Sequence, residues 1–88
     1  MKEKFYFTFG RDPQYPYGID DYVVVEAKGY CEACSLFNMV HPPREGSDLI
    51  NCAFIYSEKQ FTEKCAKYYP GVQPKEIISL NVKKEDEQ

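Results

Sequence analysis

The segment "DYVVVEAKGYCEACSLFNMV", residues 21–40, contains the two patterns that decide the fold. Residues 21–27 are rich in β-branched side chains, which predicts a strand that ends before Gly29. Residues 30–40 place apolar side chains on one arc of a helix, which His41 and two prolines then end. This arc comprises Tyr30, Ala33, Leu36, Phe37 and Val40.

Three more strands and a second helix are predicted around this unit. Residues 4–9, 51–57 and 76–82 have the composition of strands. The second helix begins at Ser57, where a capping box fits, and ends at Pro70-Gly71. Its apolar arc comprises Phe61, Cys65, Tyr68 and Tyr69. The order strand–strand–helix–strand–helix–strand (ββαβαβ) predicts an α+β two-layer sandwich, with both helices on one face of a four-stranded sheet.

Length and composition indicate one small folded domain. We expect residues 1–82 to form it and residues 83–88, "KKEDEQ", to be a solvated charged tail. Eight Tyr and six Phe are too many aromatic residues for a disordered chain. The net charge of −3 argues against nucleic-acid duplex binding, which needs a basic patch.

The sequence predicts a protein of the cytoplasm with no membrane partner. Its opening lacks the apolar run of a signal peptide, and no stretch approaches the ~18 apolar residues of a membrane span. We therefore expect the four cysteines to be reduced thiols.

Three connections are predicted to converge on one rim of the sheet. A helical crossover implies that strand 51–57 runs parallel to strand 21–27. The connections 10–20, 41–50 and 70–74 then lie at the same end.

This rim carries the residues that we expect to bind a ligand. The first two connections hold the chain's two arginines, whose planar forks suit phosphates or carboxylates, and tyrosines that can stack on a base. The predicted ligand-binding residues are Arg11, Tyr15, Tyr17, Arg44, Ser47 and Asp48. As an alternative, the Tyr-Pro pairs only stiffen the loop and each arginine pairs with a nearby carboxylate such as Asp12 or Asp48.

Both faces of the predicted sheet are apolar or aromatic. Two helices on one face would leave the other exposed, and such a patch normally marks an interface. The predicted interface residues are Tyr6, Tyr22, Phe54 and Tyr56. We expect a homodimer or a docked partner on this face; partial covering by the long loops is the alternative.

Cys31 and Cys34 form the one motif with potential for metal or thiol chemistry, since Cys-x-x-Cys can be half a zinc site or a redox pair. Cys52 and Cys65 stand alone on other elements, and Cys65 is expected in the core. We expect no metal and no cofactor; a zinc site that gathers all four cysteines by folding, or a thiol site at the motif, is the alternative.

The sequence contains no signature of an enzyme. It has no Gly-rich phosphate loop, no His-Glu-x-x-His and no Gly-x-Ser-x-Gly, and a nucleophile–histidine pair would have to use the single His41. We therefore expect a non-enzymatic protein.

The combination of "FYFTFG", "GIDDYVVVEA", a helix and "NCAFIYSEKQF" resembles small proteins encoded by phages and prophages of Gram-positive bacteria. The resemblance covers roughly residues 5 to 80 and carries no catalytic residues. It implies a phage protein in the host bacterial cytoplasm that inhibits an antiviral defence. Such a protein would sequester a nucleotide second messenger or, like an anti-CRISPR protein, dock on a host defence protein such as a CRISPR effector. A self-assembling structural or regulatory phage protein is the alternative.

Overall fold

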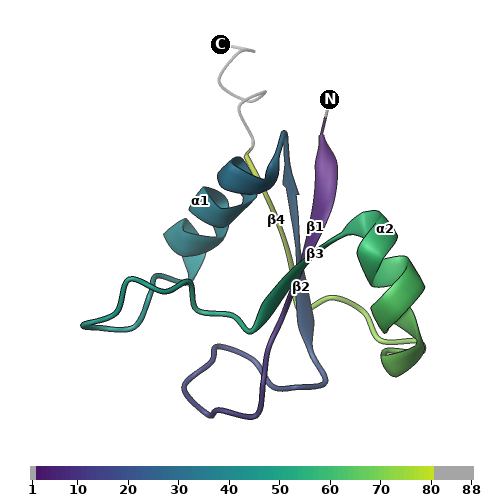
Figure 1. Cartoon of the computed structure of the whole chain (residues 1–88), viewed down its shortest axis with the longest axis horizontal. Coiled ribbons are helices and arrows are strands. Elements are labelled where there is room, and N and C mark those ends of the chain that lie inside the picture. The colour runs from purple at the N-terminus through teal and green to yellow at the C-terminus, as the bar shows by residue number, and fades with distance from the viewer. Residues whose placement is uncertain (1, 81–88) are drawn as a thin grey trace.

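The computed structural model describes residues 2–80 of the chain. The charged tail predicted at 83–88 and the end of the strand predicted at 76–82 lie outside the described residues. Along the chain the elements are β1 (Glu3–Thr8), β2 (Tyr22–Ala27), α1 (Tyr30–Val40), β3 (Phe54–Ser57), α2 (Glu58–Gln60), η1 (Phe61–Cys65), η2 (Ala66–Tyr68) and β4 (Glu76–Ser79). The predicted α+β class, with four strands and two helical segments in the order ββαβαβ, is confirmed (Figure 1).

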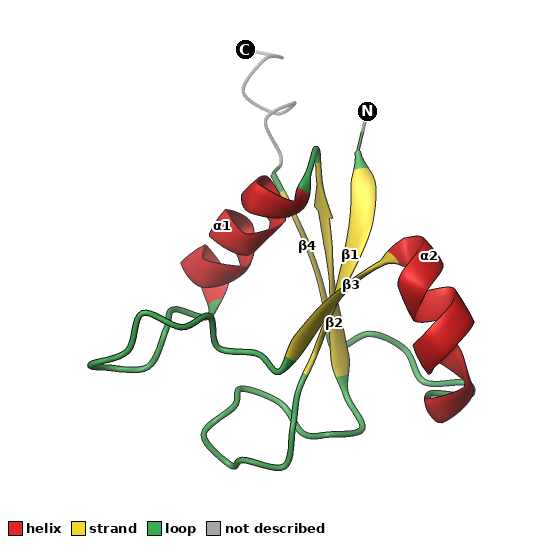
Figure 2. Ribbon diagram, in the orientation of Figure 1, coloured by secondary structure: helices red, strands yellow, loops and turns green. Residues whose placement is uncertain are grey.

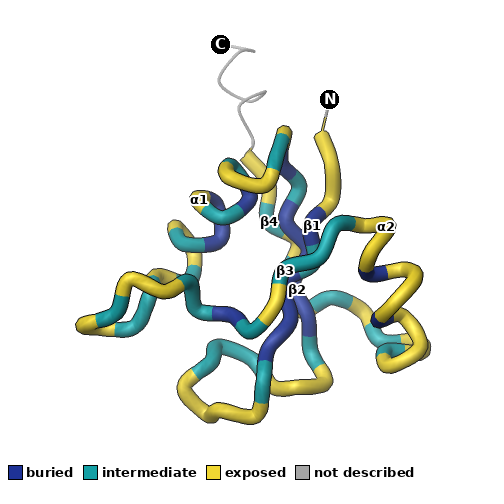
Figure 3. The backbone as a smooth tube through the Cα atoms, viewed as in Figure 1, coloured by how far each residue is buried: buried dark blue, intermediate teal, exposed yellow. Residues whose placement is uncertain are grey.

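The four strands form one mixed sheet in the order β3-β1-β2-β4. β1 is antiparallel to both neighbours, and β2 is parallel to β4. In the central pair, Phe5 lies opposite Val25 and Phe7 lies opposite Val23, so their side chains share one face. The exposure map shows the buried residues concentrated on these central strands (Figure 3).

The two helical segments cover opposite faces of the sheet, which corrects the prediction that both lie on one face (Figure 1). The chain passes from β2 to β3 by way of α1 and then returns across the whole sheet to β4 by way of α2. These two crossovers run in opposite sideways directions, so crossovers of the same hand must lie on opposite faces. The result is three layers, helix–sheet–helix, in place of a two-layer sandwich.

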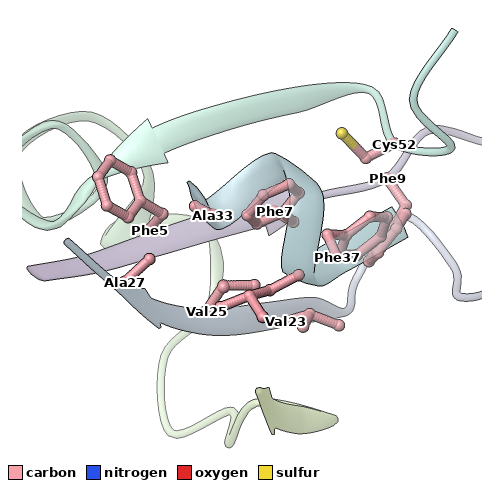
Figure 4. Close-up of a cluster of buried hydrophobic side chains, with 10 residues drawn as sticks. Phe5, Phe7, Phe9, Val23, Val25, Ala27, Ala33, Phe37 and Cys52 are labelled. Carbon is pink, nitrogen blue, oxygen red and sulfur yellow. The ribbon is translucent and has the colours of Figure 1, made fainter. Parts of the chain in front are cut away.

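The α1 face carries the larger core, in which aliphatic and phenylalanine side chains dominate (Figure 4). Phe7 of β1 stacks on Phe37 of α1 with ring centroids 4.4 Å apart, and both side chains are fully buried. Of the predicted helical arc, Ala33, Leu36 and Phe37 are buried, while Tyr30 and Val40 at the two ends of α1 are exposed.

The other face is covered by the segment 58–68, so the sheet face that we expected to be open is a second core. Tyr6 stacks on Phe61 with ring centroids 4.2 Å apart. Tyr22 is buried and its hydroxyl donates to the Val72 carbonyl at 2.8 Å. The predicted interface residues Tyr6, Tyr22 and Tyr56 therefore pack within the chain, and only Phe54 is largely exposed.

The segment 58–68 begins as predicted and then departs from α-helical geometry. The Ser57 hydroxyl accepts from the Gln60 backbone N–H, and the Gln60 side chain accepts from the Ser57 N–H, which confirms the capping box. A π-helical turn follows at η1 and a 3-10 turn at η2. The π-helical and 3-10 segments have a different number of residues per turn from an α-helix, so the residues of the predicted arc no longer share one side. Phe61 and Cys65 are buried, but Tyr68 is exposed.

Among residues 2–80, no helix has the length and apolar character needed to cross a membrane.

Candidate binding site

Three long loops lie at one end of the sheet, which confirms the predicted rim (Figure 2). They connect β1 to β2, α1 to β3 and η2 to β4. The first and third contact each other, since the Tyr69 hydroxyl lies 3.5 Å from the Ile19 carbonyl oxygen and Lys75 Nζ lies 3.8 Å from Asp21 Oδ1. At the opposite end, β2 reaches α1 through two residues and β3 passes directly into α2.

Arg44 holds the second loop, between α1 and β3, against the first loop, between β1 and β2. Its Nη2 lies 3.1 Å from Asp12 Oδ2, and its guanidinium lies over the Tyr15 ring, 5.0 Å from the centroid. The Gln14 backbone N–H, which donates to Asp12, and the Arg44 guanidinium together hold the pKa of Asp12 below its usual value. For Arg44 the structure thus shows the alternative that we weighed for each arginine, a pairing within the chain.

His41, Glu76 and Tyr17 form a cluster that links α1, β4 and the first loop. His41 Nε2 lies 2.6 Å from Glu76 Oε1, and the His41 ring meets the Tyr17 ring edge-on at 5.6 Å. Burial and the nearby Glu76 carboxylate raise the pKa of Tyr17. This cluster was missed from the sequence because Glu76, the first residue of β4, is 35 residues from His41. The cluster holds the rim in place.

Arg11 differs from Arg44 in having no carboxylate within ion-pair distance among residues 2–80. It is exposed and lines two cavities. We call the first, of about 540 Å³, the rim pocket; its walls include Gly10, Arg11, Tyr15, Tyr17, Ile19 and Lys75. We call the second, of about 510 Å³, the aromatic groove; its walls include Arg11, Phe54, Tyr56, Lys64, Tyr68 and Tyr69.

The remaining predicted site residues lie apart from Arg11. Ser47 and Arg44 line a third cavity, of about 270 Å³, together with Tyr15. The Ser47 hydroxyl is engaged locally, accepting from the Leu49 N–H at 3.1 Å. Asp48 is exposed and lines neither the rim pocket nor the aromatic groove. Arg11, Tyr15 and Tyr17 are therefore the predicted residues that share one cavity.

The aromatic groove was not predicted as a cavity, although two of its wall residues, Phe54 and Tyr56, are predicted interface residues. Phe54 and Tyr68 are 63% and 68% exposed, so both rings are largely open to solvent. Tyr68 belonged to the predicted helical arc, and the change of helical phase leaves it outside the core. The sequence contains more tyrosines than two short helices can bury, so some exposed tyrosines were to be expected. The sequence did not show which ones.

All four cysteines are free thiols among residues 2–80. Cys52 and Cys65 are buried, as predicted for Cys65, and Cys31 is exposed. Burial raises the pKa of the Cys34 thiol, and burial together with nearby Cys34 raises that of Cys52 to about 12, which disfavours the reactive thiolate. Within the described part of the chain, no group of three or more His, Cys, Asp or Glu side chains could hold a metal ion.

Comparison with known proteins gave no match: the chain resembles no family model, no curated protein and no solved structure closely enough to be assigned to it. The similarity to phage proteins stays a prediction. Function is inferred from the rim and the groove.

Proposed function

We propose that this chain is a non-enzymatic binding protein that captures a nucleotide-derived ligand at the loop rim. The observation that carries the proposal is Arg11, an exposed guanidinium with no ion pair within residues 2–80, beside a groove walled by aromatic rings. A guanidinium recognises a phosphate through charge-assisted hydrogen bonds, and aromatic faces stack on bases.

The dimensions and chemistry of the groove support a small ligand. Its volume of about 510 Å³ lies within the range of small-molecule sites, roughly 300–1,000 Å³. Lys64 adds a second cation, so a phosphate has two positive partners in the walls. Phe54 and Tyr68 expose ring surface on which a base can stack, worth about 1–3 kcal/mol per base.

The biological role that we propose follows from the resemblance to phage proteins. A phage protein that sequesters a nucleotide second messenger in the host cytoplasm prevents the signal from activating an antiviral defence. Capture alone suffices for this role, so the protein needs no reacting group.

The test is calorimetric titration with mononucleotides, ADP-ribose and cyclic dinucleotides. We expect at least one to bind, and Arg11→Ala to weaken binding about tenfold to a hundredfold, the cost of losing a charge-assisted hydrogen bond of ~1.5–3 kcal/mol. Thermal stability should be unchanged, since the Arg11 side chain is exposed.

The matched control is Lys28→Ala, which removes one positive charge at the opposite end of the sheet, where Lys28 is exposed. Its affinity should equal that of the wild type. Absence of binding heat with every nucleotide would overturn the proposal.

The exposed rings favour a second candidate, docking on a host defence protein. Exposed Phe and Tyr side chains beside an arginine have the composition of a protein-binding hot spot. In that case the wild type binds no nucleotide, and Phe54→Ala with Tyr68→Ala abolishes association with the defence protein. The predicted homodimer loses most of its expected interface, since Tyr6, Tyr22 and Tyr56 pack within the chain, and sedimentation tests it directly.

A further inference from the structure

The rim pocket and the aromatic groove are neighbouring cavities with a common wall. Gly10, Arg11 and Ile19 line both. The Arg11 guanidinium, which makes no ion pair among residues 2–80, belongs to both. A ligand centred on Arg11 can therefore extend into each.

Each cavity has its own aromatic and cationic groups. The rim pocket contributes Tyr15 and Lys75, and the aromatic groove contributes Tyr68 and Lys64. Tyr15 belongs to the first loop and Lys75 to the third, whereas Lys64 belongs to η1 and Tyr68 to η2. Each cavity, which we call a lobe of the site, thus has an aromatic ring and a lysine that can hold one base.

The charges in the walls limit how much negative charge the ligand carries. Asp12 is paired with Arg44, and Asp21 accepts from the Gly18 N–H at 2.9 Å and lies 3.8 Å from Lys75. The charges left over are Arg11, Lys64 and Asp20, a surplus of a single positive charge. This small positive surplus disfavours a triphosphate, whose negative charge is much larger than that of a phosphodiester.

We infer that the rim pocket and the aromatic groove form one two-lobed site for a dinucleotide, with a base in each lobe and the phosphodiester at Arg11. The inference rests on the proposed function and names the ligand class for the same site.

The first experiment titrates the wild type with cyclic di-AMP, cyclic di-GMP, AMP and GMP. We expect one cyclic dinucleotide per chain, bound at least about tenfold more tightly than the corresponding mononucleotide, because joining the two bases makes the second contact intramolecular. Equal affinities for mononucleotide and dinucleotide would overturn the two-lobed site and leave the proposed function standing. Absence of binding by all four would overturn the two-lobed site, and absence of binding by ADP-ribose as well would overturn the proposed function.

The second experiment changes one lobe at a time. Tyr68→Ala in the groove and Tyr15→Ala in the rim pocket should each weaken dinucleotide binding at least about fivefold, as expected for a lost stacking contact. Tyr15 also packs against the Arg44 guanidinium, so Lys75→Ala is a second rim variant that spares this contact. Lys59→Ala, an exposed change on α2 outside both cavities, is the control and should bind like the wild type.

The pattern across these variants decides the inference. Losses from both lobes support one continuous site. Wild-type affinity in both Tyr15→Ala and Lys75→Ala, with a loss only in Tyr68→Ala, would confine the ligand to the groove and overturn it.

Discussion

The two faces of the sheet use the same strands but bury different chemistry. On the α1 face, Phe7, Phe37, Val23 and Val25 are almost completely buried and carry no polar atom in their side chains. On the α2 face, tyrosines, whose side chains carry polar hydroxyls, supply much of the packing.

This difference gives the faces different requirements. An aliphatic and phenylalanine core needs only close packing, whereas each buried hydroxyl needs a hydrogen-bond partner. Tyr22 finds its partner in Val72, which belongs to the loop that leads to β4. The α2 face therefore depends on a loop at the rim, and the aromatic groove opens on this less completely buried side.

The largest expected effect on the free energy of unfolding comes from removing one aromatic ring from each core. Phe37→Ala is expected to lower the free energy of unfolding by about 3–5 kcal/mol, because Phe37 is fully buried and stacked on Phe7. Phe61→Ala should cost less, since its site lies closer to solvent and can relax. Urea unfolding of the two variants measures the difference; an equal or larger loss for Phe61→Ala would show that the α2 face is the principal core.

Alkaline pH should act on both faces, since burial raises the pKa of Cys52 in the α1-face core to about 12 and raises the pKa values of several tyrosines on the α2 face. Burial is the largest cause that raises the pKa values of Tyr6, Tyr22, Tyr56 and Tyr69 above 10.0. The folded state therefore holds these phenolic protons more tightly than the unfolded chain. The resulting stability is fully present below about pH 10 and is lost as the pH rises through the folded pKa values.

Urea midpoints measured from about pH 8 to 11 check this expectation. Tyr6→Phe should flatten the alkaline decline, while Tyr68→Phe, which changes an exposed ring, should leave it as in the wild type. Tyr17 and Tyr30, at the margins of the α1 face, act in the same direction. An identical decline of the urea midpoint with pH in the wild type and in Tyr6→Phe would show that Tyr6 does not contribute to it.

Tyr22→Phe should lower stability less than the core variants or alkaline pH do. It removes the hydrogen bond to the Val72 carbonyl and keeps the ring, at an expected cost of about 0.5–1.5 kcal/mol. Hydrogen exchange in the loop 69–75 should increase at the same time, because this bond ties the loop to β2. Unchanged exchange there would mean that other contacts hold the loop.

Local sequence patterns were sufficient to predict most of the elements. The β-branched run and the apolar arc within residues 21–40 predicted β2 to within one residue and α1 at both of its ends. The capping box at Ser57 placed the start of α2. These features depend on neighbours within a few residues, which a sequence displays directly.

The errors concern contacts between distant residues. The face that each helix covers depends on the order β3-β1-β2-β4, which no local pattern encodes. The aromatic groove depends on a π-helical turn that shifts Tyr68 out of the predicted arc. The engagement of Arg44 depends on the second loop reaching Asp12, 32 positions earlier in the chain. The rim was predicted because it follows from strand direction, but the division of roles between Arg11 and Arg44 was not.

The late position of β4 has a consequence for synthesis on the ribosome. β2, a strand of almost wholly buried residues, has β4 as its partner on one side, with Val23 opposite Glu76 and Val25 opposite Ile78. A growing chain must therefore hold β2 with one unpaired side until residues 76–79 have left the exit tunnel. Exposed apolar strand edges associate with one another. Chains that end before residue 76 should therefore be prone to aggregation, because β2 keeps one apolar edge unpaired in them.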